Sequence, residues 1–453
     1  MKKIAGLIRR FKKKGNVIER MFDSIHRFFS EKKLRRSQAS AFEKINHMSP
    51  CTRVMHAFAK RYVRRCYEKN LQHLRNAVKH RKIRIAFLSC DVTKWHGAML
   101  YNLFAESDNF EPVVLVSKLL KKRGDDEFYG AVSHFKNAGI RVEEAHSPET
   151  DTRISILKFL PDIVFYEQPW SVDEKHRLMI ASSRALVCYV PYCCHMMVSE
   201  YNYLKKFHRY LWKYFVESDE HVEMCRSRFG ADNCVSVGNV HWDRYAVESK
   251  PASYFWKDCS SAKKRVVYAP HFSFDASHMT ATFHENGRAM LNMASMYPNT
   301  TWVIRPHPDF DAHVVDNGIM TPAELAEYYA EWKKYGNVFR GAEYVGLFKS
   351  SDCLITDCIS FLADYLPTGN PVFHLRNRLQ SAEFNDYGKE IIGTYYQIHS
   401  PAELEKLFSR VMIEGDDFMG EQRAALMKKF APTDGKSASM RIFECIASAL
   451  GIQ

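Results

Sequence analysis

The apolar residues of this chain gather in short runs that read as buried β-strands, with helical stretches between them. One series begins at residue 82 and comprises KIRIAFLSCD, PVVLVS (112–117), DIVFY (162–166) and ALVCYV (185–190). A second series begins at residue 264 and comprises RVVYAPH, TWVIRPHP, NVFRG, DCLITD and PVFHL. Strands that are apolar on both faces and alternate with helices are typical of parallel sheets. The pattern therefore predicts an α/β protein with two open sheets, divided near residues 245–262, where Ser, Lys and Pro collect.

A different pattern precedes residue 80. From residue 4 to residue 29, apolar residues recur at three-, four- and seven-residue spacing with Lys and Arg between them, which predicts an amphipathic basic helix. A second basic segment, residues 53–79, carries Val54, Phe58, Tyr62 and Cys66 at four-residue spacing. The favoured interpretation is a platform on anionic lipid. The alternatives are a helical hairpin packed on the protein's own body and, least favoured, an arm for nucleic acid.

The distribution of charge agrees with this division. The chain has 453 residues and a formal net charge of +13. Residues 1–80 hold 22 Lys/Arg and 5 Asp/Glu, whereas residues 81–453 hold 43 Lys/Arg and 47 Asp/Glu. A nucleic-acid-binding protein would be basic throughout, so we expect a nearly neutral body with a cationic arm and no nucleic-acid partner. The predicted domains are residues 1–80, 81–250 and 251–453.

Cysteine usage and apolar run length indicate the compartment. The twelve cysteines have neither the spacing of a disulfide framework nor a paired CxxC zinc motif, which favours a reducing cytoplasm. The apolar part of the start, MKKIAGLIRRFKKK, is too short for the core of a signal peptide. No run reaches the roughly 18 apolar residues of a membrane span. We therefore expect a soluble or peripherally attached protein.

Residues 354–375, LITDCISFLADYLPTGNPVFHL, predict one strand–helix–strand unit. Its helix begins near Ser360 and ends at a Gly-Asn-Pro stop, residues 369–371. Such a unit places a helix N-terminus at the carboxyl edge of a parallel sheet, where backbone amides and the helix dipole can hold a phosphate. Thr356, Asp357 and Ser360 lie at that edge, which predicts a nucleotide or phospho-substrate.

Three histidines closely follow predicted strands. His271 ends YAPH, His307 lies in RPHP, and His195 ends YVPYCCH. Because ligands of open α/β sheets lie outside the carboxyl ends of the strands, this repetition favours a functional role over a packing role. Two prolines fix the backbone around His307, and Arg305 offers a planar charged group suited to phosphate. A rigid loop that merely ends the strand is an equal alternative for this last block.

These blocks carry a family resemblance. YAPHFSFD, WVIRPHP and LFKSSDCLITDCISFLADYLPTGNPVFHL, in this order, resemble the CDP-glycerol:poly(glycerophosphate) glycerophosphotransferase family, the teichoic acid primases and polymerases, over roughly residues 185–430. Residues 215–245, with Gly238 and Asp243, resemble that family's link between lobes. The resemblance implies a GT-B-like fold, in which two Rossmann-like domains face each other across a cleft. The acceptor domain would be residues 81–250, and the nucleotide-donor domain would be residues 251–453.

The resemblance also implies roles for single residues. A histidine of the N-terminal domain is the proposed base, and a second histidine, in an Arg-x-His-Pro block, binds the donor phosphate. By position these are His195 and His307. No cofactor or metal is expected, and no DxD motif or other carboxylate pair lies in a strand-end loop. The predicted donor-binding residues are Arg305, His271, Thr356, Asp357, Ser360 and Asp364.

Three departures from the family pattern limit these assignments. His271 stands where the family commonly has a threonine after Ala-Pro, so it is either a donor contact or a neutral change. The family's histidine stands in a His-Gly pair after aromatic residues, whereas His195 lies between Cys194 and Met196. This leaves His96, in KWHG, as an alternative base. Cys358-Ile359-Ser360 stands where Tyr-Ser-Ser is usual, so one hydroxyl is missing and the transferred alcohol stays open.

The implied reaction is a phosphoryl transfer at the cytoplasmic face of the bacterial inner membrane. An acceptor hydroxyl attacks the β-phosphorus of a CDP-linked alcohol, a histidine takes the proton, and CMP leaves. The expected partners are a CDP-activated polyol or nucleotide-sugar donor, a lipid-linked or polysaccharide acceptor, and an anionic membrane surface. The alternatives are a GT-B glycosyltransferase that uses a nucleotide sugar for capsule or lipopolysaccharide synthesis, and a non-catalytic membrane-bound partner with the same fold.

Overall fold

The computed structural model describes residues 50–452 apart from the segments 119–124, 169–175, 199–205, 248–249, 259–262, 275–279, 342–343, 379–382 and 432–433. Residues 1–53 and 54–453 form two separate units. The amphipathic helix predicted over residues 4–29 lies outside the described residues. The second predicted basic segment, residues 53–79, lies within them, and its residues up to 77 belong to α4 (Pro50–Ala77). In the described part of the chain, no helix is long and apolar enough to cross a membrane.

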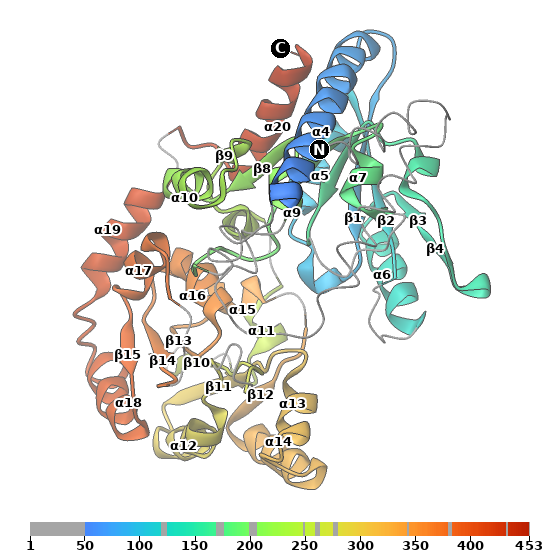
Figure 1. Cartoon of the computed structure of the whole chain (residues 1–453). Coiled ribbons are helices and arrows are strands. Elements are labelled where there is room, and N and C mark those ends of the chain that lie inside the picture. The colour runs from blue at the N-terminus through green and yellow to red at the C-terminus, as the bar shows by residue number, and fades with distance from the viewer. Residues whose placement is uncertain are drawn as a thin grey trace. The chain divides into compact units, whose positions relative to one another are not determined.

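The N-terminal domain is built on a parallel seven-stranded sheet (Figure 1). In sheet order its strands are β3 (Val142–Glu144), β2 (Phe110–Val116), β1 (Ile83–Ser89), β6 (Ile163–Tyr166), β7 (Leu186–Tyr189), β8 (Lys213–Val216) and β9 (Cys234–Ser236). Besides α4, the described α-helices between β1 and β9 are α5 (Ala98–Glu106), α6 (Asp125–Asn137), α7 (Leu178–Ala181), α9 (Lys206–Arg209) and α10 (Asp219–Phe229). A small antiparallel pair, β4 (His146–Ser147) and β5 (Thr152–Arg153), lies outside this sheet.

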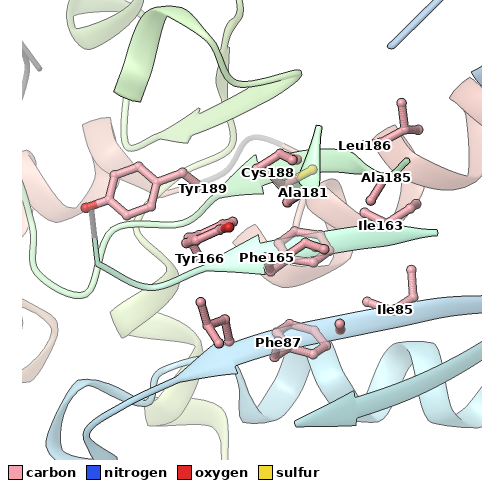
Figure 2. Close-up of a cluster of buried hydrophobic side chains, with 14 of the residues drawn as sticks. Ile85, Phe87, Ile163, Phe165, Tyr166, Ala181, Ala185, Leu186, Cys188 and Tyr189 are labelled. Carbon is pink, nitrogen blue, oxygen red and sulfur yellow. The ribbon is translucent and has the colours of Figure 1, made fainter. Parts of the chain in front are cut away.

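The core of this domain explains the apolar runs in the sequence. Residues on both faces of β1, β6 and β7 are buried, as Figure 2 shows for side chains of these three strands. The rings of Phe87 and Phe165 stack with their centroids 5.1 Å apart. A strand buried on both faces has no polar position to interrupt it, so its sequence is continuously apolar.

The C-terminal domain is built on a second parallel sheet of six strands. In sheet order these are β12 (Gly336–Val338), β11 (Thr300–Ile304), β10 (Lys264–Ala269), β13 (Cys353–Thr356), β14 (Val372–Leu375) and β15 (Tyr396–Ile398). The helices of residues 252–430 are α11 (Ala252–Phe255), α12 (Phe283–Met296), α13 (Phe310–Asp316), α14 (Pro322–Tyr335), α15 (Val345–Lys349), α16 (Ile359–Tyr365), α17 (Asp386–Ile392), α18 (Pro401–Phe408) and α19 (Gly420–Phe430). The α/β prediction with two open parallel sheets is confirmed.

The last helix, α20 (Ala438–Leu450), departs from the predicted domain division. The sequence placed it with residues 251–453, but Ile442, Ile446 and Leu450 are buried in the hydrophobic core of the N-terminal sheet. Figure 1 shows α20 beside α4 and α5. The carboxylate of Asp243 fixes its start by accepting hydrogen bonds from the backbone N–H groups of residues 438 and 439, at 3.0 and 2.7 Å. The chain therefore crosses back to the N-terminal domain after α19.

Candidate functional site

The carboxyl edge of the C-terminal sheet brings two of the predicted histidines together. His271 follows β10 and His307 follows β11, and these strands are neighbours in the sheet. The two imidazole centroids lie 5.2 Å apart, and the ring of Phe272 lies 4.3 Å from that of His307. This edge is also where the strand order reverses, because β10 pairs with β11 on one side and with β13 on the other. Ligands of open α/β sheets bind at such a switch point.

Both histidines have one ring nitrogen fixed by the backbone. The N–H of Asp309 donates to Nδ1 of His307 at 3.1 Å, so Nδ1 is an acceptor and the neutral ring carries its proton on Nε2. Nδ1 of His271 likewise faces the N–H of Ser273, at 3.3 Å, and the hydroxyl of Thr280, at 2.9 Å. The side chain of His307 is 30% exposed, so it can meet a ligand at the sheet edge.

Arg305 is a buried cation at the same edge. Its backbone N–H donates to the carbonyl of Tyr268 at 2.8 Å, which extends the β10–β11 pairing. The guanidinium carbon lies 4.8 Å from the ring centroid of Tyr344 and 4.7 Å from that of Phe361. Burial lowers the pKa of Arg305, and its buried Nε has no hydrogen-bond partner in the described structure. A guanidinium in this position has unused capacity to bind an anion.

Thr356 and Asp357 shape this edge from inside the protein. The hydroxyl of Thr356 donates to the carbonyl of Ala269 at 2.6 Å and accepts from the N–H of residue 358 at 3.0 Å. Asp357 accepts from the N–H of His271 at 2.6 Å and from the N–H and hydroxyl of Thr282 at 2.6 and 2.9 Å. Burial raises the pKa of Asp357 to about 6, against the effect of these hydrogen bonds. Both side chains are fully buried, so they would affect a donor through the loops that they hold.

The other two predicted residues lie on α16. Ser360 is half-buried in the first turn. Asp364 is buried, and its Oδ2 accepts a hydrogen bond from the hydroxyl of Tyr344 at 2.6 Å. Its Oδ1 lies 3.2 Å from Nδ1 of His241. Burial alone would raise the pKa of Asp364, but His241, Tyr344 and Arg244 outweigh burial and hold it below its usual range. Asp364 is therefore a carboxylate shared by a tyrosine and a histidine.

Three members of this group were not predicted from the sequence: His241, Arg244 and Tyr344. His241 and Arg244 belong to η5 (Val240–Ala246), the short 3₁₀ helix after β9. Neither ring nitrogen of His241 has a hydrogen bond of good geometry among the described residues. The centroid of its ring lies 3.9 Å from that of His96. The only signal in the sequence for His241 and Arg244 was that they lie on either side of Asp243, in the segment that resembles an interdomain link.

His96 enters the group from the N-terminal domain. Its Nδ1 lies 3.2 Å from an Nη1 of Arg244, and the guanidinium of Arg244 lies 4.7 Å from the centroid of Tyr344. Burial, together with His241 and Arg244, holds the pKa of His96 well below its usual range, so the ring is neutral. His96 thus connects to Arg305 through Arg244 and Tyr344.

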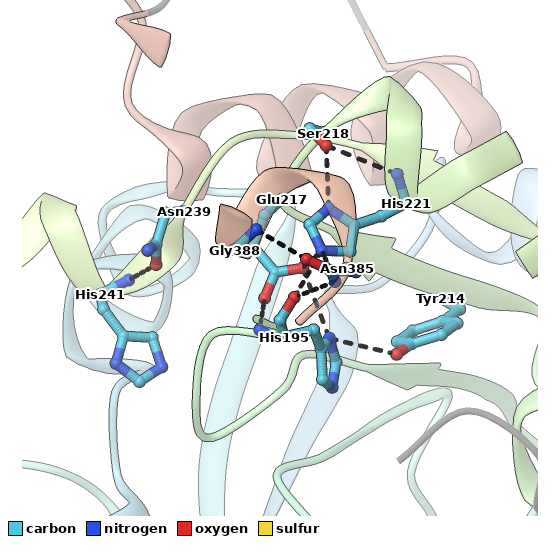
Figure 3. Close-up of polar contacts among 9 residues, drawn as sticks. All are labelled: His195, Tyr214, Glu217, Ser218, His221, Asn239, His241, Asn385 and Gly388. Carbon is cyan, nitrogen blue, oxygen red and sulfur yellow. Dashed lines mark hydrogen bonds and ion pairs between the residues drawn. The ribbon is translucent and has the colours of Figure 1, made fainter. Parts of the chain in front are cut away.

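His195, the predicted base, lies in a second buried network, which Figure 3 shows. Its backbone N–H donates to Oε1 of Glu217 at 2.8 Å, and its Nδ1 lies 3.4 Å from Oε2. Burial would raise the pKa of Glu217, but His195 and His221 outweigh it and lower that pKa far below the usual range. The carbonyl of His195 accepts from the side-chain amide of Asn385 at 2.6 Å. The catalytic role of His195 stays a prediction.

This second network joins the two domains. The N–H of residue 198 donates to the carbonyl of residue 383, and the N–H of Asn385 donates to the carbonyl of Met196, at 2.8 and 2.9 Å. Gly388 permits this approach, because a Cβ there would lie 2.2 Å from the oxygen of Met196. The loop after β7 is therefore fixed against the start of α17.

A metal site is not evident in the described structure, where no group of three or more His, Cys, Asp or Glu side chains is placed to hold an ion. The residues brought together at the sheet edge are instead cationic, imidazole and aromatic groups. Such groups suit a phosphate ester and a nucleotide.

Comparison with known proteins establishes the fold. The sequence matches no protein-family model and no curated protein sequence. The structure is similar to UDP-GlcNAc 2-epimerase from Neisseria meningitidis bound to UDP-GlcNAc, with a TM-score of 0.53, 13% identity, and coverage of 81% of this chain and 100% of that chain. It is similar to S. aureus MnaA in complex with UDP, with a TM-score of 0.53, 13% identity, and coverage of 82% and 98%.

A third similar structure is that of the wall teichoic acid polymerase TagF. Its TM-score is 0.51 at 13% identity, over 86% of this chain and 98% of that chain. The predicted GT-B-like fold of two Rossmann-like domains is thereby confirmed. At this sequence identity the likeness establishes the fold alone.

Proposed function

We propose that this chain is a transferase that moves a glycerol-phosphate, or another polyol-phosphate, unit from a CDP-linked donor to a lipid-linked or polysaccharide acceptor in bacterial cell-surface polymer synthesis. The main support is the gathering of Arg305, His271 and His307 at the switch point of the C-terminal sheet. A diphosphate needs hydrogen-bond donors and positive charge on a fixed backbone, and these three residues offer both. The similarity of the fold to that of TagF agrees with this reaction class.

In the proposed reaction, the acceptor hydroxyl attacks the β-phosphorus of the donor. The bond from that phosphorus to the oxygen bridging it to CMP breaks, CMP leaves, and a phosphodiester forms. Arg305 and His307 would stabilise the charge that builds on the phosphoryl oxygens. Hydrogen-bond donors that are already held in position need little reorganisation as this charge develops. Ser360 would contact the diphosphate from the start of α16.

For the general base, we propose His241, oriented by Asp364, as the alternative to His195. A carboxylate 3.2 Å from one imidazole nitrogen can orient the ring and stabilise its protonated form. Asp364 also connects through Tyr344 to Arg305, which would couple proton transfer to phosphate binding. His195 is instead held by Glu217 at the domain junction.

Variants decide between the two bases. His241→Gln should lower the single-turnover rate by about 100-fold or more, as expected for loss of a general base. His195→Gln should retain most of that rate, and the exposed His284→Gln serves as the matched control. The reverse order of effects would return the assignment to His195.

The alternative is a glycosyltransferase that uses a nucleotide sugar. It is supported by the similarity of the fold to structures that bind UDP and UDP-GlcNAc, whose TM-scores of 0.53 are close to the 0.51 of TagF. The released nucleotide separates the two, because attack at phosphorus releases CMP whereas attack at the sugar carbon releases a nucleoside diphosphate. We would incubate the full chain with a crude lipid-linked acceptor and with CDP-glycerol, CDP-ribitol or UDP-GlcNAc, and identify products by phosphorus NMR. Turnover with none of the three would favour a non-catalytic protein.

We also propose peripheral attachment to the cytoplasmic face of the inner membrane. The support is the excess of Lys and Arg in residues 1–80. Deleting residues 1–40 should move the protein from the membrane pellet to the supernatant, and unchanged pelleting would contradict the proposal.

A further inference from the structure

A cavity of about 270 Å³ lies in the N-terminal domain, between α4, the residues that lead into β8, and the loop that leads into β9. Residues 209–212 and 232–233 precede their strands and Lys213 is the first residue of β8, so the cavity is at the amino edge of the sheet. Ligands of the reaction site lie at the carboxyl edges of the strands in such folds. This cavity is therefore separate from the site described above.

The lining of the cavity is positively charged. Lys60 and Arg64 of α4 both bind the carboxylate of Asp232, at 3.1 and 2.9 Å. One carboxylate thus serves two cations. The lining also includes Arg209 and Lys213, and no described carboxylate lies within ion-pair distance of either. The exposed Glu68 is the one further acid of the lining, so the cations are in excess.

Arg209 is the most informative of these cations. Its side chain is half-buried, its Nε is buried without a hydrogen-bond partner among the described residues, and burial lowers its pKa. A guanidinium that is partly removed from water without a partner is costly, and an anion in the cavity would offset that cost. Nζ of Lys213 lies 5.6 Å from the ring centroid of Trp212, which places a second cation beside an aromatic wall.

Apart from Asn233, the remaining lining is aliphatic or aromatic. Val63 is buried, and Leu71 and Trp212 are half-buried. A ligand that suits both the cationic part and the apolar part of the lining carries an anionic phosphate with an apolar chain next to it. On α4, the helix that forms one wall, Phe58 is 59% exposed. An exposed aromatic on a basic helix is typical of a segment that meets a membrane surface.

We propose that this cavity binds the phosphate of an anionic lipid headgroup, with Arg209 and Lys213 contacting the phosphate and Trp212 and Leu71 contacting the first carbons of the lipid chain. A free phosphate ion could make the same contacts with the cations, but it has no hydrocarbon part to contact the apolar wall. The proposal goes beyond the transfer reaction and does not depend on which donor is used. It adds a lipid-selective contact to the general attraction of the cationic segment.

The test is calorimetric titration of the full chain with three water-soluble probes. These are dihexanoyl phosphatidic acid below its micelle concentration, dihexanoyl phosphatidylcholine at the same concentration, and inorganic phosphate. We expect the phosphatidic acid to bind and the other two to bind at least tenfold more weakly. The double variant Arg209→Gln/Lys213→Gln should weaken phosphatidic acid binding at least tenfold.

The matched control is Lys158→Gln/Arg184→Gln, which removes the same charge from exposed positions outside the cavity and should bind like the wild type. Circular dichroism melts of both double variants confirm that they fold. Equal binding of phosphatidic acid to the wild type and the cavity variant would overturn the proposal. Equal affinity for inorganic phosphate would overturn the lipid assignment, and equal affinity for phosphatidylcholine would overturn recognition of net negative charge.

Discussion

Replacing Arg305 with lysine tests whether the buried guanidinium binds the donor. The substitution keeps the positive charge but removes the plane that lies 4.8 Å from the ring of Tyr344 and 4.7 Å from that of Phe361. It also removes the fork of N–H groups that can hold two phosphate oxygens at once. Lysine can still place one ammonium near one ring.

The two losses have different sizes and different readouts. Losing one of the two desolvated cation–π contacts should lower the free energy of unfolding by about 1–2 kcal/mol. Losing one charge-assisted hydrogen bond to phosphate costs about 1.5–3 kcal/mol, which lowers kcat/KM by roughly 10- to 150-fold. The catalytic effect should therefore exceed any effect of stability, since the variant stays folded under assay conditions.

The assay is CMP release from CDP-glycerol, with unfolding in urea measured in parallel. Arg340→Lys is the matched control. The guanidinium of Arg340 lies 4.7 Å from the ring of Tyr329 and pairs with Asp311 at 2.8 Å, but its side chain is 46% exposed. This control loses a similar stacking contact without removing a buried phosphate-binding group. If kcat/KM of Arg305→Lys stays within about threefold of the wild type, donor binding by Arg305 is refuted.

Three further predictions concern buried carboxylates. Asp357→Asn places a side-chain amide N–H opposite the backbone N–H of His271 or Thr282, so one hydrogen bond is lost. We expect the free energy of unfolding to fall by about 1–3 kcal/mol and the KM for the CDP-linked substrate to rise. Glu217→Gln removes one partner from a buried charge network and should cost about 3–5 kcal/mol at pH 7. Because the pKa of Glu217 is lowered in the fold, its stabilisation is present above its ordinary pKa of 4.5 and is lost as the pH falls below that value, so the wild type and this variant should converge in acid urea titrations. Asp243→Ala removes the two hydrogen bonds that start α20 and should lower the urea midpoint by an amount equivalent to about 1–2 kcal/mol.

Surface carboxylates provide the controls for these three changes. Glu223 pairs with Arg226 at 3.2 Å, and both side chains are 64% exposed. Glu223→Gln should change the unfolding free energy by less than about 1 kcal/mol, because water already solvates both charges. A cost for Glu217→Gln no larger than this would mean that the buried network contributes nothing beyond a surface pair.

The sequence predicted most of the strands because nearly all of the predicted strands, β12 being the exception, are buried on both faces. That burial makes the sequence of a single strand continuously apolar, and no distant residue is needed to recognise it. The predicted runs correspond to β1, β2, β6 and β7 in one sheet and to β10 through β14 in the other. The strands without a predicted run from pattern alone include β3 and β15, which lie at sheet edges and are short. Position at an edge is not the whole reason, because the edge strand β12 was predicted whereas the interior strand β8 was not. A strand of three or four residues leaves only a short apolar run.

The candidate site divides in the same way. Residues directly after apolar runs, such as His271, Arg305 and His307, could be found because the carboxyl ends of parallel strands must meet at one edge. Their grouping follows from the order β11–β10–β13 alone. The use of Asp357 as a support for the loop after β10 could not be found, because its partners, the backbone N–H groups of His271 and Thr282, are brought to it only by the folded chain.

Tertiary structure decided three features. These are the contact of His241 with Asp364 and His96, the burial of His195 against Glu217, and the return of α20 to the N-terminal domain. Each joins segments that are far apart in the chain, and no local pattern records which distant segment supplies the partner. Apolar periodicity depends on burial, which the sequence shows residue by residue. Hydrogen bonds and ion pairs depend on the position of two specific atoms, and only the folded chain fixes those positions.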